Sequence, residues 1–249
     1  MEIQSLQNAQ VKQWAKLKQK KYREESGRFL IEGMHLIEEA YRAGLIEQIV
    51  CTKECTPPYT DLPITFATRA ILDKITASVS GSDIAAVCRI PQSRPMRSKR
   101  PILLDRIQDP GNLGAIIRSA YAFGYDTLLL SEGCADPYND KVIRSTQGAL
   151  FHLHLHTCSL PKVIRTLKEH AIPVYATALH QNSIPLAKLP AQNAYALIFG
   201  NEGQGVSEEL LALSDATEFI EMERFESLNV AVAAGITLYE MNQKCKRLP

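Results

Sequence analysis

Short, almost continuous apolar runs alternate with amphipathic helices through the second part of the chain, and this alternation limits the folds open to it. The expected strands are ILLD (102–105), TLLLS (127–131), LHLH (153–156), VYATAL (174–179), ALIFG (196–200) and FIEM (219–222). The expected helices lie near 112–123, 139–146, 160–170, 207–214 and 228–244. Strands without a polar face are buried on both sides, so the pattern predicts an α/β fold with a mostly parallel sheet and helices on both of its faces.

A smaller alternation precedes this one. A basic helix over 6–21 is followed by expected strands at 29–33, 47–52, 64–67 and 84–90 and by expected helices at 34–43 and 69–76. These elements predict a small α/β domain over residues 1–93. The stretch PQSRPMRSKRP (91–101) has three prolines, four basic residues and no apolar period. We therefore expect a linker at 94–101 and a second domain over 102–249.

Composition excludes several classes of protein. Apolar residues make up 45% of the 249 residues and charged residues 22%, which is typical of a soluble globular chain. No apolar run approaches the roughly 20 residues that span a bilayer. The first residues, MEIQSLQNAQVKQW, contain no apolar signal core, so we expect a cytoplasmic protein. The six cysteines include no CxxC pair, which favours reduced thiols over a metal site.

Basic residues cluster near the amino terminus, although the net charge of the chain is only +1. The cluster consists of Lys12, Lys16, Lys18, Lys20, Lys21, Arg23 and Arg28, and only Glu24 and Glu25 offset it nearby. Two interpretations stay open on charge alone. The cluster is a solvated helix face, or it follows the phosphates of a nucleic acid, for which clustered lysine and arginine supply most of the non-specific affinity.

The stretch DRIQDPGNLGAIIRSAYAFG (105–124) joins a tight turn to an apolar helix with one arginine in its middle. Pro110 and Gly111 are expected in the turn, and Asn112 is a suitable N-cap. Arg118 lies off the apolar stripe among small residues, and helical side chains lean toward the helix amino terminus. Its guanidinium and the free amides near Asn112 are expected to converge on an anion. From this segment alone, a solvated arginine is the alternative.

A glycine-rich loop follows an expected buried strand in LIFGNEGQGVSEEL (197–210). Gly200, Gly203 and Gly205 would let a ligand approach the backbone at the carboxyl end of the strand, where open α/β sheets bind ligands. The spacing does not fit the G-x-G-x-x-G dinucleotide fingerprint. Glu202 would repel a phosphate, so the loop suits a ligand with hydroxyl, amino or cationic groups.

The stretch MERFESLNVAVAAGITLYE (222–240) begins the last expected helix. Ser227 is expected as its N-cap and Asn229 in its first turn. The helix is apolar nearly all round, which predicts burial. A capped core helix accounts for Ser227 but gives no reason for Asn229.

Three histidines alternate in FHLHLH (151–156), so that His152, His154 and His156 would share one face of a strand. At about 3.3 Å per residue they spread too far to hold one zinc ion comfortably. The pattern favours a polar or interface face, with no more specific role, and we predict no metal site.

Taken in order, the segments 105–124, 197–207 and 220–240 resemble the signature motifs of the SpoU (TrmH-type) RNA 2′-O-ribose methyltransferases, in the SPOUT superfamily. The segment FLIEGMHLIEEAYRAG (29–44) resembles the start of the small substrate-binding domain that many members carry, which is related to an RNA-binding fold of ribosomal proteins. Glu221, Arg224 and Ala231 depart from residues common in the family, and the first two leave the shape of the cofactor loop open.

The resemblance implies a fold, a cofactor and an assembly. The second domain would carry a carboxy-terminal trefoil knot, a rare exception to the rule that chains do not thread loops. S-adenosylmethionine would bind bent in that knot, and members act as homodimers whose site is completed across the interface. The implied cofactor-binding residues are Thr177, Leu179, Phe199, Gly200, Gly203, Ile220, Met222, Ser227 and Leu228.

The resemblance also implies polar site residues, which are Asn112, Arg118, Glu202, Ser227 and Asn229. Arg118 is the residue implicated in activating the ribose hydroxyl, because an adjacent guanidinium stabilises the alkoxide as its charge develops. Arginine stays protonated at neutral pH, so an RNA phosphate or a water is the expected proton acceptor. The expected RNA contacts are Lys12, Lys16, Lys20, Lys21, Arg23, Arg28 and Arg118.

Ribosomal RNA is the preferred substrate, by analogy with the ribosomal-protein fold of the accessory domain, and transfer RNA is the alternative. Two further functions stay open. A non-catalytic RNA-binding or ribosome-assembly protein on the same fold would be favoured by loss of Asn112, Arg118 or Asn229, but all three are present. A metabolic enzyme that binds a nucleotide at the glycine loop would leave the basic amino terminus unexplained.

Overall fold

The computed structural model describes residues 2–78, 81–92, 98–179, 182–224 and 227–248, which form two compact units. One unit contains Met1–Gln92 and Tyr138–Phe151, and the other contains Ser93–Pro137 and His152–Pro249. The linear division expected from the sequence places 138–151 in the second domain, whereas the structure groups this segment with the amino-terminal residues. Residues 94–97 of the expected linker lie outside the described residues.

The carboxy-terminal unit is built on a seven-stranded sheet with the order β10-β12-β9-β11-β6-β7-β8, in which every pairing is parallel. Its strands are β6 Ile102–Leu104, β7 Thr127–Leu130, β8 His154–Thr157, β9 Val174–Thr177, β10 Ile184–Pro185, β11 Ala196–Phe199 and β12 Ala216–Phe219. Its helices are α5 Pro110–Ala122, α7 Leu160–Glu169, α8 Glu208–Leu213, α9 Val230–Lys246 and the 3-10 helix η2 Leu186–Lys188.

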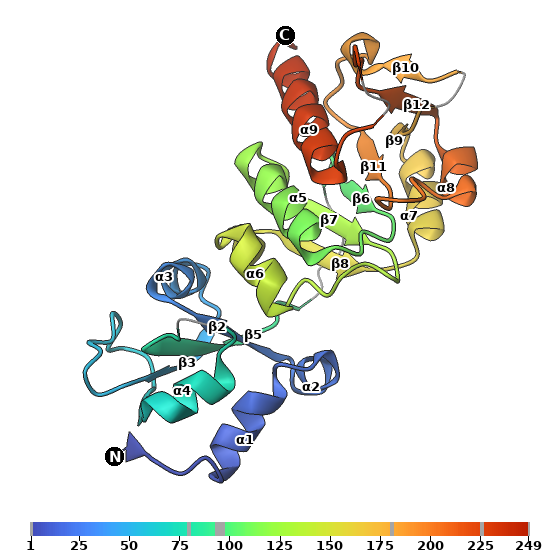
Figure 1. The fold of residues 1–249 in the computed structure, drawn as a ribbon. Coiled ribbons are helices and arrows are strands. Elements are labelled where there is room, and N and C mark those ends of the chain that lie inside the picture. Colours follow the sequence, from blue (N-terminus) through green and yellow to red (C-terminus); the bar gives the residue numbers. More distant parts are fainter. Residues whose placement is uncertain (1, 79–80, 93–97, 180–181, 225–226, 249) are drawn as a thin grey trace. The chain divides into compact units, whose positions relative to one another are not determined.

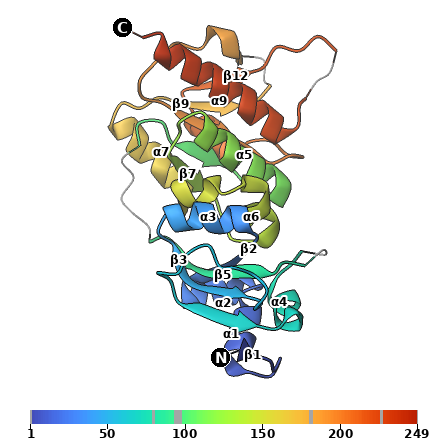
Figure 2. The ribbon, with the colours of Figure 1, turned by 90° about the vertical axis from the view of Figure 1, so that its left-hand side faces the viewer.

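Helices cover both faces of this sheet, as predicted. α5 and α9 pack together on one face, and α7 and α8 pack together on the other (Figure 1). In Figure 2, α9 and α5 lie in front of the sheet. Leu103 and Ile198 of the sheet pack with Ile164 of α7 and Leu210 of α8. Because side chains alternate along a strand, the buried Leu104 points to the opposite face, toward α5 and α9.

The amino-terminal unit has a mixed five-stranded sheet with the order β1-β4-β3-β5-β2, in which β5 is antiparallel to both of its neighbours. Its strands are β1 Glu2–Ile3, β2 Arg28–Glu32, β3 Ile46–Cys51, β4 Ile64–Ala67 and β5 Ile84–Arg89. Its helices are α1 Ala9–Lys16, α2 Lys20–Ser26, α3 Met34–Arg42, α4 Arg69–Ile75 and α6 Asp140–Thr146, and η1 spans Ala149–His152. Val11 and Trp14 of α1 pack against Ile71 of α4 and Val50 of the sheet.

The basic helix predicted over 6–21 is two helices, so that prediction is wrong. α1 ends at its C-cap Leu17, and α2 begins at Lys20. The guanidinium of Arg23 is buried, and its Nη1 donates a hydrogen bond of 2.7 Å to the carbonyl oxygen of Leu17. A buried arginine therefore holds the turn between the two helices.

The segment Tyr138–Phe151 completes the core of the amino-terminal unit. Phe29 of β2 is fully buried, and its ring centroid lies 4.9 Å from that of Tyr138 and 6.1 Å from that of Phe151. Arg144 of α6 forms an ion pair of 3.3 Å with Glu32 of β2. The aromatic and ionic contacts together explain why this segment belongs with residues that precede it by about a hundred positions.

Candidate active site

The carboxyl ends of β9, β11 and β12 lie at one edge of the parallel sheet, and a pocket of about 310 Å³ opens there. It is lined by eight of the nine residues that the sequence predicted for cofactor binding, namely Thr177, Leu179, Phe199, Gly200, Ile220, Met222, Ser227 and Leu228. Gly203, the ninth, lies in the same loop but outside the pocket lining. Glu202 and Asn229 also line the pocket.

Asn112 lies inside α5 rather than at its cap. The helix begins at Pro110, and its N-cap is Asp109, whose side chain accepts a hydrogen bond of 2.8 Å from the backbone N–H of Asn112. Aspartate is as good an N-cap as asparagine, and proline is favoured at the first helical position. The predicted N-cap is therefore wrong, and the side chain of Asn112 is left for other contacts.

Asn229, not Ser227, is the N-cap of α9. Its Oδ1 accepts hydrogen bonds from the backbone N–H groups of Ala231 and Val232, at 2.9 and 3.3 Å. Ser227 is exposed at the rim of the pocket. The predicted cap is therefore wrong, and capping supplies the structural reason for Asn229 that the sequence did not.

Glu202, Asn112 and Asn229 form one hydrogen-bonded chain across the three motif segments. Nδ2 of Asn112 donates to Oε1 of Glu202 at 2.9 Å, and Nδ2 of Asn229 donates to Oδ1 of Asn112 at 2.9 Å. The backbone N–H of Asp109 also donates to Oε1 of Glu202, at 3.3 Å.

The acidity of Glu202 follows from these contacts. Partial burial pushes the pKa of Glu202 upward, but hydrogen bonds from Asn112 and from backbone N–H groups outweigh burial and hold the pKa below its ordinary value. Glu202 is therefore ionised at neutral pH and places a negative charge beside the pocket.

Arg118 does not join this chain of hydrogen bonds. It lies six residues beyond Asn112 on α5, about 9 Å along the axis at 1.5 Å per residue. Its side chain is exposed and forms no hydrogen bond or ion pair with any described residue. The guanidinium is therefore available to another molecule, and its convergence with the amides near Asn112 on an anion stays a prediction.

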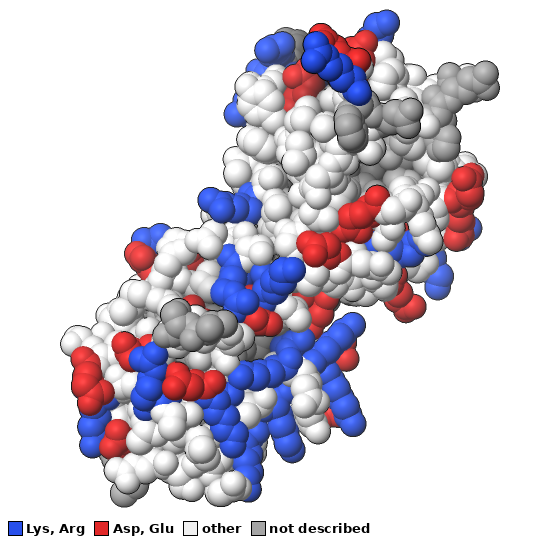
Figure 3. Space-filling model, viewed as in Figure 1, with Lys and Arg blue, Asp and Glu red and all other residues white. Residues whose placement is uncertain are grey.

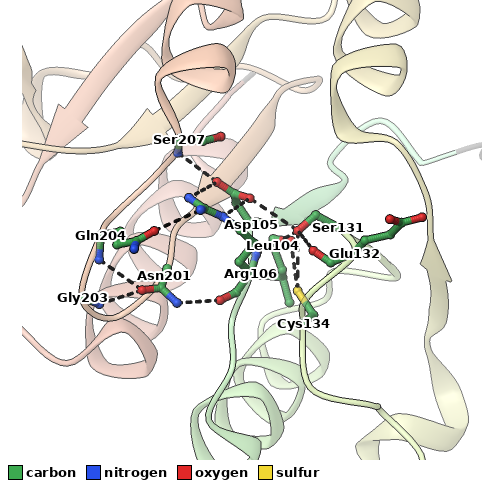
Figure 4. A network of polar contacts seen from close by, with 10 residues as sticks. All are labelled: Leu104, Asp105, Arg106, Ser131, Glu132, Cys134, Asn201, Gly203, Gln204 and Ser207. Carbon is green, nitrogen blue, oxygen red and sulfur yellow. Dashed lines mark hydrogen bonds and ion pairs between the residues drawn. The ribbon is translucent and has the colours of Figure 1, made fainter. Parts of the chain in front are cut away.

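A second polar network ties the glycine loop to the loop after β6 (Figure 4). Buried Asp105 accepts a hydrogen bond from the backbone N–H of Ser207 at 2.9 Å. Asn201 donates from Nδ2 to the carbonyl oxygen of Arg106 at 2.9 Å, and Nη1 of Arg106 donates to Oε1 of Gln204 at 3.0 Å. The two loops joined in this way carry the first and second motifs.

Asp105 and Asn201 were not among the predicted site residues. The available signal was chemical, because Asp105 is an acid directly after a wholly apolar strand and Asn201 lies between the glycines of the loop. Their hydrogen bonds hold the segment of Asn112 against the segment of Glu202.

Gly200 is required by packing inside its own loop. A Cβ on Gly200 would lie 2.1 Å from the backbone nitrogen of Val206 and 2.2 Å from the carbonyl carbon of Gly205. Asn201 and Gly205 pair as a short antiparallel bridge, which brings these atoms against Gly200. On Gly203, by contrast, a Cβ would make only an ordinary contact, 3.6 Å from Oδ1 of Asn201.

Glu218 of β12 is a buried acid in the pocket wall that the sequence analysis did not single out. Its Oε1 accepts hydrogen bonds from the hydroxyls of Thr177 and Thr237, at 2.6 and 3.3 Å, and its Oε2 has no hydrogen-bond partner among the described residues. Burial raises the pKa of Glu218, opposed by the two threonines and by the positive charge of Lys244. This acid interrupts the apolar pattern, which explains why the predicted strand FIEM starts three residues after β12 does.

Exposed lysines and arginines gather over α1 and α2 (Figure 3). Six of the seven residues of the basic cluster are exposed, namely Lys12, Lys16, Lys18, Lys20, Lys21 and Arg28. Lys16 and Arg28 also line a groove of about 580 Å³ with Tyr22, and Nζ of Lys16 lies 5.0 Å from the centre of that ring. Arg23 is only 4% exposed and bonded to Leu17, so it is withdrawn from the predicted RNA contacts.

The three histidines were expected to share one face of a strand, and this prediction is wrong. β8 begins at His154, whereas His152 belongs to η1 and stacks on Tyr121 with ring centroids 5.1 Å apart. Among the described residues, no group of three or more His, Cys, Asp or Glu side chains could hold a metal ion. In the same part of the chain, no helix combines the length and the apolar character needed to cross a membrane.

One face of α9 is apolar and exposed on the single chain, whereas the apolar pattern predicted burial of this helix. Val232, Ile236 and Tyr239 follow each other at helical spacing and are 51%, 39% and 51% exposed. Tyr121 of α5 is also exposed, and the ring of Phe123 contacts that of Tyr239 with centroids 5.6 Å apart. Apolar faces of this kind mark interaction sites.

Comparisons with known proteins agree with this geometry. Residues 99–239 match the SpoU rRNA Methylase family, and residues 8–86 match the MRM3-like substrate binding domain. The chain is 39% identical over 245 residues to the 23S rRNA (guanosine(2553)-2′-O)-methyltransferase RlmP of Bacillus subtilis, covering 96% of this chain and 98% of that protein.

Two solved structures with bound AdoMet have the same fold. One is an rRNA methyltransferase from Sinorhizobium meliloti, with a TM-score of 0.87, 28% identity and coverage of 100% and 99% of the two chains. The other is the SpoU methyltransferase AviRb from Streptomyces viridochromogenes, with a TM-score of 0.87, 26% identity and coverage of 98% and 100%.

The matches confirm the predicted resemblance, the enzyme class of RNA 2′-O-ribose methyltransferase and the cofactor S-adenosylmethionine. The matched segment contains the five predicted polar residues Asn112, Arg118, Glu202, Ser227 and Asn229. Since one family match extends over more than half of its length, the chain belongs to the SpoU rRNA Methylase family.

Proposed function

We propose that this protein transfers a methyl group from S-adenosylmethionine to a ribose 2′-hydroxyl in the RNA of the large ribosomal subunit. The observation that carries the proposal is the hydrogen-bonded chain of Glu202, Asn112 and Asn229, two members of which line the pocket. The choice of RNA is supported by the Bacillus subtilis relative, whose name specifies a guanosine of 23S rRNA.

The pocket suits S-adenosylmethionine chemically. Its wall combines apolar side chains, such as those of Ile220 and Leu228, with the unpartnered carboxylate oxygen of Glu218, so a ligand with an apolar ring and amino groups satisfies both. The ionised Glu202 favours a cationic ligand. When bound, the cofactor supplies an electrophilic methyl group on a sulfonium. The nine predicted cofactor-binding residues, Gly203 included, hold it in this proposal.

The polar residues then have separate roles. Asn229 fixes the side chain of Asn112, and Asn112 holds Glu202 ionised beside the pocket. Ser227, at the rim, contacts the incoming ribose. Arg118 binds an RNA phosphate and stabilises the negative charge that develops on the attacking 2′-oxygen. The proton of the hydroxyl passes to that phosphate or to a water, because arginine stays protonated at neutral pH.

The amino-terminal unit binds RNA beyond the reacting nucleotide in this proposal. Lys12, Lys16, Lys20, Lys21 and Arg28 supply phosphate contacts. The ion pairs of Lys20 with Glu24 and of Lys21 with Glu25 do not prevent this, because they are exposed and long, at 3.6 and 3.8 Å, and such pairs contribute little. Arg28 forms a shorter pair with Glu47, at 2.6 Å, but its side chain is also exposed to solvent.

The protein acts as a homodimer in this proposal. The exposed apolar face of Val232, Ile236 and Tyr239 is supporting evidence, since a second copy would cover it. The trefoil knot in the cofactor region and a location in the cytoplasm complete the proposal.

The test uses purified protein, tritiated S-adenosylmethionine, and ribosomal or transfer RNA from cells that lack the protein. We expect 2′-O-methylation of 23S rRNA by the wild type and at least a hundredfold less by Arg118→Ala. Arg165→Ala, which removes an exposed arginine from α7 on the opposite face of the sheet, should remain as active as wild type. Transfer of label to transfer RNA alone, or full activity of Arg118→Ala, would contradict the proposal.

A further inference from the structure

Glu218 is a buried acid whose hydrogen bonding is incomplete. It is 0% exposed and lines the cofactor pocket. Thr177 and Thr237 both donate to Oε1, whereas Oε2 has no hydrogen-bond partner among the described residues. Native proteins leave few buried polar atoms unsatisfied, because each costs stability. A donor from outside the chain is therefore indicated for Oε2.

The surroundings of Glu218 determine which of its oxygens remains available. Thr177 ends β9 and Thr237 belongs to α9, so two elements fix the rotation of the carboxylate by bonding to Oε1. Lys244 is the cation whose charge acts on Glu218.

The ammonium of Lys244 does not take up the remaining oxygen. It donates to the carbonyl oxygens of Leu186, Ala187 and Leu189, at 2.7, 2.9 and 2.8 Å. An ammonium has three donors, so Lys244 has none left for Oε2 of Glu218.

The pocket wall indicates which group of the cofactor the oxygen meets. Ile220, Leu228, Val230 and Ala233 line the same pocket with apolar surface, which accepts a flat ring better than a hydrated ammonium or ribose. The donor that such a ring carries in S-adenosylmethionine is the exocyclic amine of adenine.

We propose that Oε2 of Glu218 accepts a hydrogen bond from the exocyclic amine of the cofactor's adenine, so that Glu218 selects adenine over a 6-oxo purine. This inference rests on the cofactor use stated above and adds a residue that determines specificity. Thr177 and Thr237 act through Glu218 by orienting its carboxylate.

Isothermal titration calorimetry tests the proposal without any turnover. The ligands are S-adenosylhomocysteine and S-inosylhomocysteine, in which a 6-oxo group replaces the amine. Wild type should bind the adenine ligand at least tenfold more tightly, because a site built around a hydrogen bond rejects the analogue that lacks the donor. Glu218→Gln keeps the side-chain volume and offers an amide that can donate to the 6-oxo group. We expect this variant to reduce the ratio of affinities at least tenfold.

Glu202→Gln is the matched control, because it neutralises the other acid of the pocket. It should change the affinity for both ligands by the same factor. A ratio in Glu218→Gln within twofold of wild type, with S-adenosylhomocysteine still bound, would overturn the role of Glu218 alone. Absence of S-adenosylhomocysteine binding by wild type would instead overturn the proposed cofactor use.

A second measurement does not depend on the variant. An analogue of S-adenosylhomocysteine with hydrogen in place of the amine should bind wild type at least tenfold more weakly. Equal binding would overturn the proposal.

Discussion

The side chain of Asn229 both caps α9 and belongs to the hydrogen-bonded chain of the site. Two different substitutions of Asn229 can separate these roles, because each role uses a different atom. Its Oδ1 caps α9 through Ala231 and Val232, and its Nδ2 donates to Asn112. Asn229→Asp keeps the capping acceptor but loses the donor. Asn229→Ala loses both.

The expected magnitudes differ accordingly. Loss of an N-cap costs about 1 kcal/mol, and loss of one intramolecular hydrogen bond costs about 1 kcal/mol net, so Asn229→Ala should cost about 2 kcal/mol of stability. In Asn229→Asp the lost hydrogen bond is offset by about 0.3–1 kcal/mol from a negative charge at the helix amino terminus, so its stability should stay close to wild type. Both variants should lose at least tenfold in methyl transfer, because each removes the donor that fixes the side chain of Asn112. In Asn229→Asp a carboxylate would also face Oδ1 of Asn112, so that two acceptors meet.

Amide hydrogen exchange in the peptide 227–234 measures the stability of the first turn of α9. Urea denaturation measures the free energy of unfolding of the whole protein. Asn229→Ala should exchange faster at Ala231 and Val232 than wild type, and Asn229→Asp should not. Ser227→Ala is the control for the competing cap and should leave both measurements unchanged. If Ser227→Ala destabilised the protein as much as Asn229→Ala, or if Asn229→Asp unfolded as readily as Asn229→Ala, the assignment of the cap would be refuted.

Gly200→Ala should cost about 1–3 kcal/mol or more through overpacking against the returning loop, whereas Gly203→Ala should change stability by less than about 0.5 kcal/mol; urea denaturation of both variants checks this. Since burial raises the pKa of Glu218, its ionisation costs stability as the pH rises, and unliganded Glu218→Gln should be more stable than wild type at pH 8 by about 1–3 kcal/mol. That advantage should shrink as the pH falls toward about 4.3, the ordinary pKa of glutamate; no change with pH in denaturation midpoints would contradict it. Val232→Glu should convert the proposed dimer to a monomer in sedimentation equilibrium without unfolding α9, and an unchanged mass would argue against that interface.

The strands were predictable where both faces are buried. Ile102–Leu104 and Ala196–Phe199 are wholly apolar and wholly buried, so periodicity located them to within a residue. The strand predicted at 219–222 begins three residues too late, because the charged Glu218 lies inside β12 and interrupts the apolar pattern. A buried acid with partners on β9 and α9 has no signature in a local pattern.

The site was predictable in its members but not in their local roles. The resemblance supplied Asn112 and Asn229 by position, and the structure joins them to each other by a hydrogen bond. Each stretch offers two capping residues, Asp109 or Asn112 and Ser227 or Asn229, and propensity ranks these types almost equally. At α5 the local signal was Pro110, which is favoured at the first helical position and marks Asp109 as the cap. The contact between Asn112 and Asn229 has no such local signal, because 117 positions separate them in the chain.

The position of Phe29 has a consequence for the order in which the protein becomes stable during synthesis. Its ring is covered by Tyr138 and Phe151, which leave the ribosome long after the first 92 residues. The nascent amino-terminal segment therefore carries an uncovered aromatic ring while part of the methyltransferase unit is still being translated, and domains that would otherwise fold in turn become coupled. A truncated chain that ends at Gln92 should leave this ring exposed and should therefore be poorly soluble. The segment that covers the ring lies outside residues 8–86, which match the substrate binding domain.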